Sequence, residues 1–149
     1  MSEDIIENNV LIAEFMGAKY KKNVSFSLKE GYLWLPYHGI VNYTTVELGC
    51  GKILKYHSSW EWLMPVVERI ESIKDPHDGF YGVYISSNSC CIQGTSLHMA
   101  LSDPDYGPVY YDEVILDTKL ESTYQAVIRF IKWFNSKQQS EKNGRGHNH

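Results

Sequence analysis

Apolar residues recur at helical spacing in three stretches of the chain. In residues 3–16 the apolar side chains fall on one arc and the acidic ones on the opposite face. In residues 59–74 apolar side chains cover more than half of the circumference, so this helix is expected to be the most buried. Residues 120–134 repeat apolar positions at alternating intervals of three and four. The pattern predicts three amphipathic helices.

The ends of these helices carry signals of their own. Gly17 is placed to end the first helix, because glycine readily adopts the left-handed conformation that closes a helix. Pro65 lies beyond the first turn of the second helix, where its missing N–H predicts a kink or a restart of the helix. Thr118 and Glu121 form a predicted capping box for the last helix.

Between the first two helices the period changes to two, which is typical of half-buried strands. Residues 24–28 alternate apolar and serine side chains, and residues 32–35 are expected to return as their hairpin partner. Residues 29–31 contain the glycine that a tight turn between them favours. A third strand is expected over residues 41–48, with a bulge that restores a common buried face.

A second group of strands is expected after the second helix. Residues 75–79 combine Asp, Pro and Gly and predict a loop. Strands are expected at residues 80–85 and 90–93, joined by a polar turn. Shorter strands are expected at residues 109–111 and 114–116, with the Asp-Glu pair between them as a tight turn.

Strands grouped between helices, with hairpin-length turns, favour antiparallel pairing. We therefore predict a single α+β domain over residues 1–135, with an antiparallel sheet of about five strands packed against three helices. Residues 136–149 have no apolar side chain to dock and are expected to form a disordered polar tail. The prediction requires four apolar side chains to be buried, namely Leu63, Val67, Val127 and Ile131.

Charge and composition narrow the setting in which the chain is expected to act. The 149 residues carry a formal net charge of −4, which repels phosphates and disfavours nucleic-acid binding. The acidic N-terminus is unlike a secretory signal, and no apolar run reaches the about 20 residues that span a bilayer. Three cysteines, Cys50, Cys90 and Cys91, fit a reducing compartment. A cytoplasmic protein without membrane contact is expected.

Residues with catalytic potential are scattered along the sequence. His57 and Glu61 could share a helix face as a metal pair or as a base with its orienting acid, although a capping role already explains Glu61. The Cys90-Cys91 pair with His98 downstream could supply a thiolate nucleophile and its base. Small apolar strand residues are the alternative, which the missing signal for a lowered thiol pKa favours. No spacing matches a metal or cofactor motif, so neither is expected.

Aromatic residues make up 13% of the chain and include eleven tyrosines. Tyr and Trp combine apolar area with a polar tip, which suits surfaces that exchange water for a partner. Trp62 and Trp133 each project away from the apolar arc of their own helix, which a partner surface would explain. Packing in the core explains part of the remaining aromatic content. The residues expected to contribute to binding are Tyr37, His57, Trp60, Trp62 and Trp133.

Three segments of the sequence are distinctive. They are LIAEFMG at residues 11–17, YHSSWEWLMPVVERIE at residues 56–71 and ESTYQAVIRFIKWFN at residues 121–135. Together they cover about a quarter of the chain. They resemble small uncharacterised proteins encoded by bacteriophages, prophages and Bacteroidetes-type bacteria, to which no activity is attached. The resemblance implies a mobile-element context and supplies no catalytic residue.

Two functions remain open at this level. The first is a non-enzymatic accessory protein that binds a protein or a small ligand through an aromatic-rich surface, as a homodimer or with a host protein. Missing motifs and the excess of Tyr and Trp favour it. The alternative is a small hydrolase or transferase whose site is assembled from scattered residues such as His38, His57, Cys90 and His98. The balance leans away from an enzyme.

Overall fold

The fold is described from a computed structural model of the chain. Its described residues are 3–22, 30–35, 39–44, 54–77, 79–94, 105 and 109–146. These residues form three helices and six strands, so the predicted α+β class is confirmed. Two compact units, Met1–Arg69 and Ile70–His149, divide the chain, and each is described by itself below. The single domain over residues 1–135 stays a prediction.

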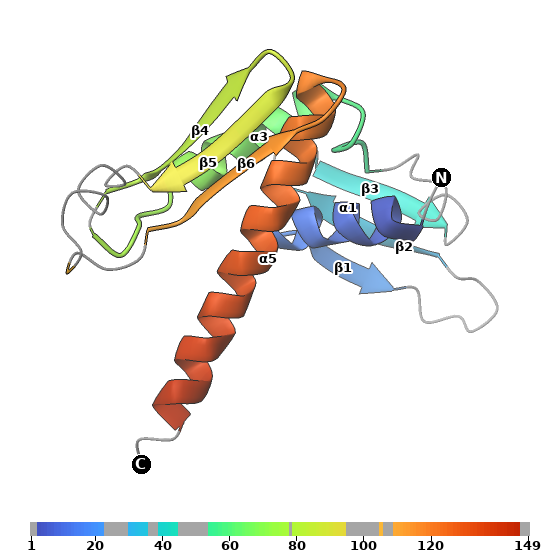
Figure 1. The fold of residues 1–149 in the computed structure, drawn as a ribbon. Coiled ribbons are helices and arrows are strands. Elements are labelled where there is room, and N and C mark those ends of the chain that lie inside the picture. The colour runs from blue at the N-terminus through green and yellow to red at the C-terminus, as the bar shows by residue number, and fades with distance from the viewer. Residues whose placement is uncertain are drawn as a thin grey trace. The chain divides into compact units, whose positions relative to one another are not determined.

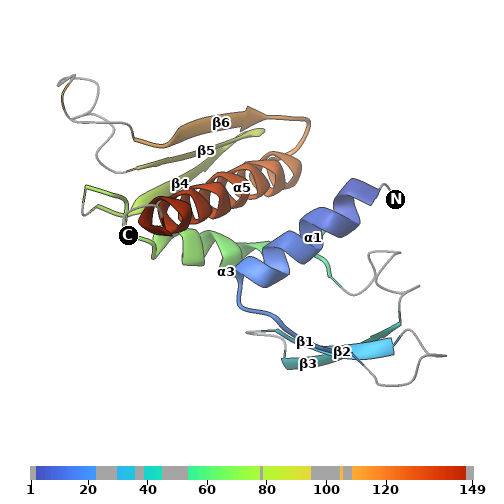
Figure 2. The same ribbon diagram turned by 90° about the horizontal axis from the view of Figure 1, so that it is seen from below.

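The first unit begins with helix α1, Glu3–Phe15 (Figure 2). Gly17 ends it as predicted, with a φ of 90°. The Gly17 N–H donates to the Glu14 carbonyl at 3.0 Å, and the Ala18 N–H donates to the Ala13 carbonyl at 2.9 Å. This pair of hydrogen bonds is a Schellman motif, which needs a left-handed residue at the position of Gly17.

Helix α3, Trp60–Glu71, reaches the end of the first unit and continues past it. Pro65 lies inside one continuous helix, so the helix does not restart there. Leu63 and Val67 are buried as predicted. Arg69 connects α3 to the end of α1, because its Nε donates to the Phe15 carbonyl at 3.0 Å. The Arg69 guanidinium also lies 5.3 Å from the centroid of the Phe15 ring, a cation–π contact.

The first unit also contains an antiparallel sheet in the order β1-β2-β3 (Figure 1). The strands are β1, Lys19–Lys22; β2, Glu30–Leu35; and β3, Gly39–Thr44. The predicted turn at residues 29–31 is wrong, because Gly31 pairs with Lys22 inside the sheet. Strand β1 was not predicted, because its four residues include three lysines and no apolar alternation; lysines are nevertheless common on edge strands such as β1. The strands predicted at residues 24–28 and 45–48 lie outside the described residues.

The second unit contains another antiparallel sheet, in the order β4-β5-β6. Its strands are β4, Tyr81–Ser86; β5, Ser89–Gly94; and β6, Tyr111–Ile115. One sheet of about five strands is therefore replaced by two sheets of three strands among the described residues. The predicted turn at Asp112 and Glu113 is also wrong, because both lie within β6. Asp112 is held there by a 3.1 Å ion pair with the Nε of Arg129 on helix α5.

Helix α5, Lys119–Gly146, lies across one face of this second sheet (Figures 1 and 2). The Thr118 hydroxyl caps it by accepting a hydrogen bond from the Glu121 N–H at 3.1 Å, as predicted. Val127 and Ile131 are buried. The helix continues beyond residue 135 into the segment expected to be a polar tail, because extending an existing helix costs little per residue.

A buried serine joins the sheet to α5. The Ser122 hydroxyl donates to the Asn88 carbonyl in the β4–β5 turn and accepts from the Leu116 N–H at 2.8 Å, just after β6. One side chain thereby forms hydrogen bonds with backbone groups of two segments, the β4–β5 turn and the connection between β6 and α5. Among the described residues of both units, no helix is long and apolar enough to cross a bilayer.

Candidate functional site

The two faces of the β4–β5–β6 sheet differ sharply in exposure. Side chains alternate between the faces along each strand. Cys90, Ile92 and Val114 point to the face that α5 covers, and all three are buried. The opposite face carries large side chains that remain open to solvent. We call this opposite face the outer sheet face, formed by Phe80, Gly82, Tyr84, Cys91, Gln93, Tyr111, Glu113 and Ile115.

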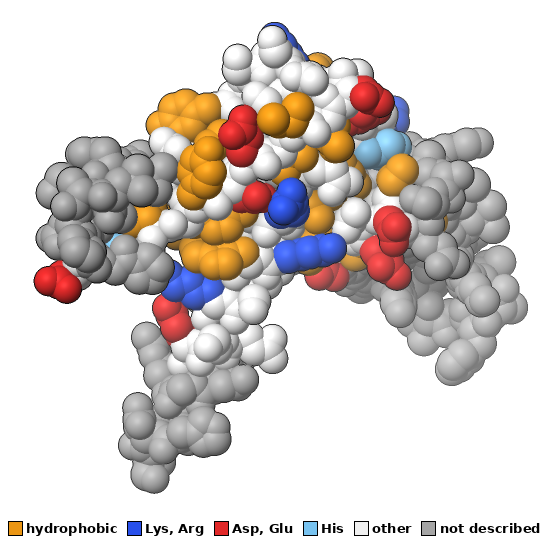
Figure 3. Space-filling model, in the orientation of Figure 1, with side chains coloured by type: hydrophobic (Ala, Val, Ile, Leu, Met, Phe, Trp, Pro, Cys, Tyr) orange, Lys and Arg blue, Asp and Glu red, His pale blue; other side chains and the backbone are white. Residues whose placement is uncertain are grey.

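Four large side chains dominate the outer sheet face. Phe80 is 45% exposed, Tyr84 and Tyr111 are each 52% exposed, and Ile115 is 62% exposed. Figure 3 shows hydrophobic side chains spread over the area that β4, β5 and β6 occupy in Figure 1. Exposed apolar residues are common singly, whereas several on one sheet face form a patch of the kind that marks an interaction site.

The strand register places these side chains in rows across the sheet. Tyr84 pairs with Cys91, which pairs with Glu113 on the other edge strand. In the neighbouring row, Gly82 pairs with Gln93, and Gln93 pairs with Tyr111. The two tyrosines therefore lie on opposite edge strands, in adjacent rows.

Both tyrosine side chains lean along their strands. A Cβ added to Gly82 would come within 2.7–2.9 Å of the Tyr84 hydroxyl and ring atoms, so the ring lies over Gly82. The Tyr111 hydroxyl donates to Glu113 Oε2 at 3.3 Å, so that ring leans toward the next row. Each ring thus covers two adjacent rows and presents a broad aromatic surface.

The thiols beside this face do not have the properties of nucleophiles. Cys90 is fully buried, and burial raises its pKa to about 11. The pKa of Cys91 is also raised, mainly by burial. The Cys91 thiol lies 3.7 Å from Gln93 Oε1, a neutral acceptor. A reactive cysteine needs a lowered pKa and access to substrate, and Cys90 has neither.

His57 has a structural partner in the first unit. The Asn9 side chain is buried, and its Nδ2 lies 2.9 Å from both the Leu54 carbonyl and His57 Nδ1. A carbonyl can only accept, so Nδ2 is the donor and His57 Nδ1 is an acceptor in the neutral ring. Burial lowers the pKa of His57, which agrees with that neutral state. Asn9 therefore connects α1 to the turn before α3.

The tryptophans expected to bind a partner are placed in different units. Trp60 is 37% exposed, while Trp62 is half-buried and packs edge-on against Tyr56 at 5.3 Å between ring centroids. Trp133 is half-buried in the second unit, where it contacts an aromatic cluster. The members of this cluster are Tyr81, Tyr110, Phe130, Trp133 and Phe134. Tyr37, His38 and His98 lie outside the described residues.

The sequence reasoning passed over Tyr84, Tyr111 and Ile115. A signal for them was present, because residues 80–85 carry large apolar or aromatic side chains at both phases of the period-two alternation. A strand of this kind, in a sheet with only one covered face, must leave one set exposed. The sequence alone does not show whether one face of the sheet or both faces are covered by other elements.

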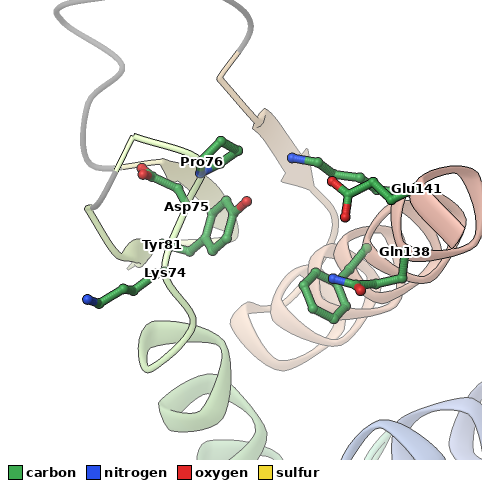
Figure 4. Close-up of a pocket in the computed structure, with 8 residues that line it drawn as sticks. Lys74, Asp75, Pro76, Tyr81, Gln138 and Glu141 are labelled. Carbon is green, nitrogen blue, oxygen red and sulfur yellow. The ribbon is translucent and has the colours of Figure 1, made fainter. Parts of the chain in front are cut away.

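A cleft lies beside the aromatic cluster in the second unit. It has a volume of ≈ 220 Å³ and is lined in part by Tyr81 and Phe134. Figure 4 shows the Tyr81 hydroxyl pointing into it, opposite Gln138 and Glu141 of α5. The Asp75 carboxylate, also labelled there, stabilises the loop that leads into β4. It accepts hydrogen bonds from the backbone N–H groups of His77 and Gly79, both at 2.9 Å. Typical ligand pockets are larger, at about 300–1,000 Å³.

Among the described residues no group of three or more His, Cys, Asp or Glu side chains is placed to hold a metal ion. Comparison with family models, curated proteins and solved structures finds no match for the chain. The site is therefore argued from the geometry of the chain alone, and the outer sheet face is its strongest feature.

Proposed function

We propose that the chain is a non-enzymatic accessory protein that acts by binding another protein, and that the outer sheet face is its binding surface. The observation that carries the proposal is the contrast within one sheet. Ile92 and Val114 are buried beneath α5, while Tyr84, Tyr111 and Ile115 are more than half exposed on the other side. Mobile-element origin and a cytoplasmic location belong to this proposal as expectations from the sequence.

The composition of the outer sheet face favours a protein partner over a small ligand. Tyrosine is enriched at protein interfaces because it offers apolar area together with a hydroxyl. The face is a broad sheet surface, whereas small ligands bind in concave sites. The cleft of ≈ 220 Å³ near Tyr81 is below the usual size of such sites.

The alternative of a small hydrolase or transferase has less support. Its thiol, Cys90, is buried and has a pKa raised to about 11, so almost none of it is thiolate at neutral pH. Its histidine, His57, uses Nδ1 to accept a hydrogen bond from Asn9. These observations assign structural roles to both residues.

Affinity capture from the native host tests the proposed function. Immobilised wild-type chain is compared with the double variant Tyr84→Glu and Tyr111→Glu, and with Met64→Glu as a control at an exposed apolar position in the first unit. We expect at least one protein, which can be the chain itself, to be retained by wild type and by Met64→Glu but lost with the double variant. Retention that is the same for all three proteins would rule out the outer sheet face as the binding surface.

A further inference from the structure

We infer that the partner of the outer sheet face is a second copy of this chain, packed face to face about a two-fold axis that runs along β5. The inference rests on the proposed function and deepens it. It commits to one partner because the side chains of this face complement one another across such an axis, as the following steps derive.

The exposed area agrees with what a dimer of this kind needs. Phe80, Tyr84, Tyr111 and Ile115 are each between 45% and 62% exposed. Taking about 200 Å² for each side chain, they present roughly 400 Å² of apolar or aromatic surface. A standard interface buries about 800 Å² per partner, of which about 60% is apolar. The outer sheet face therefore offers close to the apolar share of one side of an interface.

The two-fold axis determines which strands meet. A rotation about an axis along β5, between two facing sheets, keeps the strand direction and exchanges the two edges of the sheet. Consequently β4 of one copy lies over β6 of the other, and β5 lies over β5. Each row of paired residues therefore faces the same row of the partner copy, with the β4 and β6 ends of the row exchanged. Sheets packed in this way are about 10 Å apart, with their strands nearly aligned.

The tyrosines then face each other across the interface. Tyr84 covers its own row and that of Gly82, because its ring lies over that glycine. Tyr111 covers the same two rows from the other edge, because its hydroxyl reaches Glu113. Tyr84 of one copy therefore faces Tyr111 of the partner copy, and symmetry repeats the pair. Offset or edge-to-face tyrosine rings stabilise an interface beyond the contribution of the area that they bury.

The remaining positions are also complementary. Ile115 shares a row with Ser89 and Ser86, so the isoleucine of one copy faces the small Ser86 of the other. Glu113 is the one acidic residue of the outer sheet face, and it faces Tyr84 of the partner copy instead of another Glu113. Like charges are thereby kept apart, which an isologous interface requires of its own surface.

A charge-pair exchange tests both the partner and the register. Because Tyr84 is opposite Tyr111 and close to Glu113 of the partner copy, the double variant Tyr84→Glu and Tyr111→Glu places carboxylates opposite each other. The double variant Tyr84→Lys and Tyr111→Glu places opposite charges there. Light scattering after size exclusion, over a dilution series, is expected to give a dimer for wild type, a monomer for the Glu/Glu variant and a dimer for the Lys/Glu variant. Met64→Glu, at an exposed apolar position in the first unit, is expected to remain dimeric.

Circular dichroism and thermal unfolding of each variant establish that the folds are intact, which the surface position of both tyrosines favours. A monomeric wild type overturns the inference, as does a Glu/Glu variant that stays dimeric. Equal loss of the dimer in both double variants overturns the proposed register. A monomeric wild type that still captures another protein through the outer sheet face refutes the second copy and leaves the proposed function standing.

Discussion

The inner and outer faces of the β4–β5–β6 sheet are formed by alternate residues of the same three strands. Cys90 and Ile92 point inward and are fully buried, whereas their neighbour Cys91 points outward and is half-buried. Both faces carry large apolar side chains, so hydrophobicity alone does not distinguish them. What distinguishes them is α5, which contacts β5 and β6 on one side. The comparison teaches that a strand pattern identifies faces, while packing decides which face is a core.

The largest contrast is expected from deleting the same side chain on each face. Ile92→Ala should lower the free energy of unfolding by about 2–5 kcal/mol, because it removes a fully buried side chain and leaves a cavity. Ile115→Ala should change it by less than about 0.5 kcal/mol. Urea denaturation of dilute protein, where association contributes little, measures both values. Equal losses for the two variants would show that both faces are covered.

The two thiols sharpen the comparison through chemistry. Two variants of the Cys50→Ser protein are compared: one retains only Cys90 and the other retains only Cys91, because the remaining cysteine is replaced by serine. The alkylation rate of each thiol is then measured separately. A pKa of about 11 leaves Cys90 roughly 100-fold less thiolate at pH 8 than an unperturbed cysteine, so its alkylation should be the slower. Because the folded pKa is raised, the rate should still increase with pH beyond pH 9. A Cys90 that reacts as fast as Cys91 in dilute folded protein would contradict the burial of the inner face.

A matched pair of glycines gives the smallest contrast. Gly94→Ala places a Cβ 2.5 Å from Val109 Cγ1 and 3.0 Å from Asp75 Oδ2, so packed groups must move at a cost of about 1–3 kcal/mol. Gly82→Ala meets the tip of the Tyr84 side chain, which is exposed and can swing away. Its effect should stay within about 0.5 kcal/mol. Thermal unfolding of both variants checks the difference, and a larger loss for Gly82→Ala would reverse the assignment of the faces.

Local signals predicted much of the fold. The three helices were predicted because an amphipathic period, a left-handed glycine at Gly17 and a cap at Thr118 are properties of short stretches of chain. The hairpin of β4 and β5 followed from alternation and a polar turn. The continuous strand β6 was not predicted, because Asp112 and Glu113 are locally typical of a turn. The ion-pair partner that Asp112 finds in the strand, Arg129, comes from α5.

The candidate site was predicted less well than the fold. The aromatic excess pointed to a binding surface, but Trp62 and Trp133 were chosen by their positions on isolated helices. Each contacts other aromatic rings in its own unit. The exposed tyrosines were assigned to strands without a choice of face, since a single sequence does not say which side of a sheet a distant helix will cover.

By itself, the sequence determined the periods: that three stretches form amphipathic helices, and that residues after the first and second helices form strands with alternating faces. These depend on local sterics and on the spacing of apolar residues. Only the tertiary structure decided that α5 covers Ile92 and leaves Tyr84 and Tyr111 exposed. That choice depends on contacts between segments far apart in the chain, and the free energy of burying one face or the other is set by the element that packs against it.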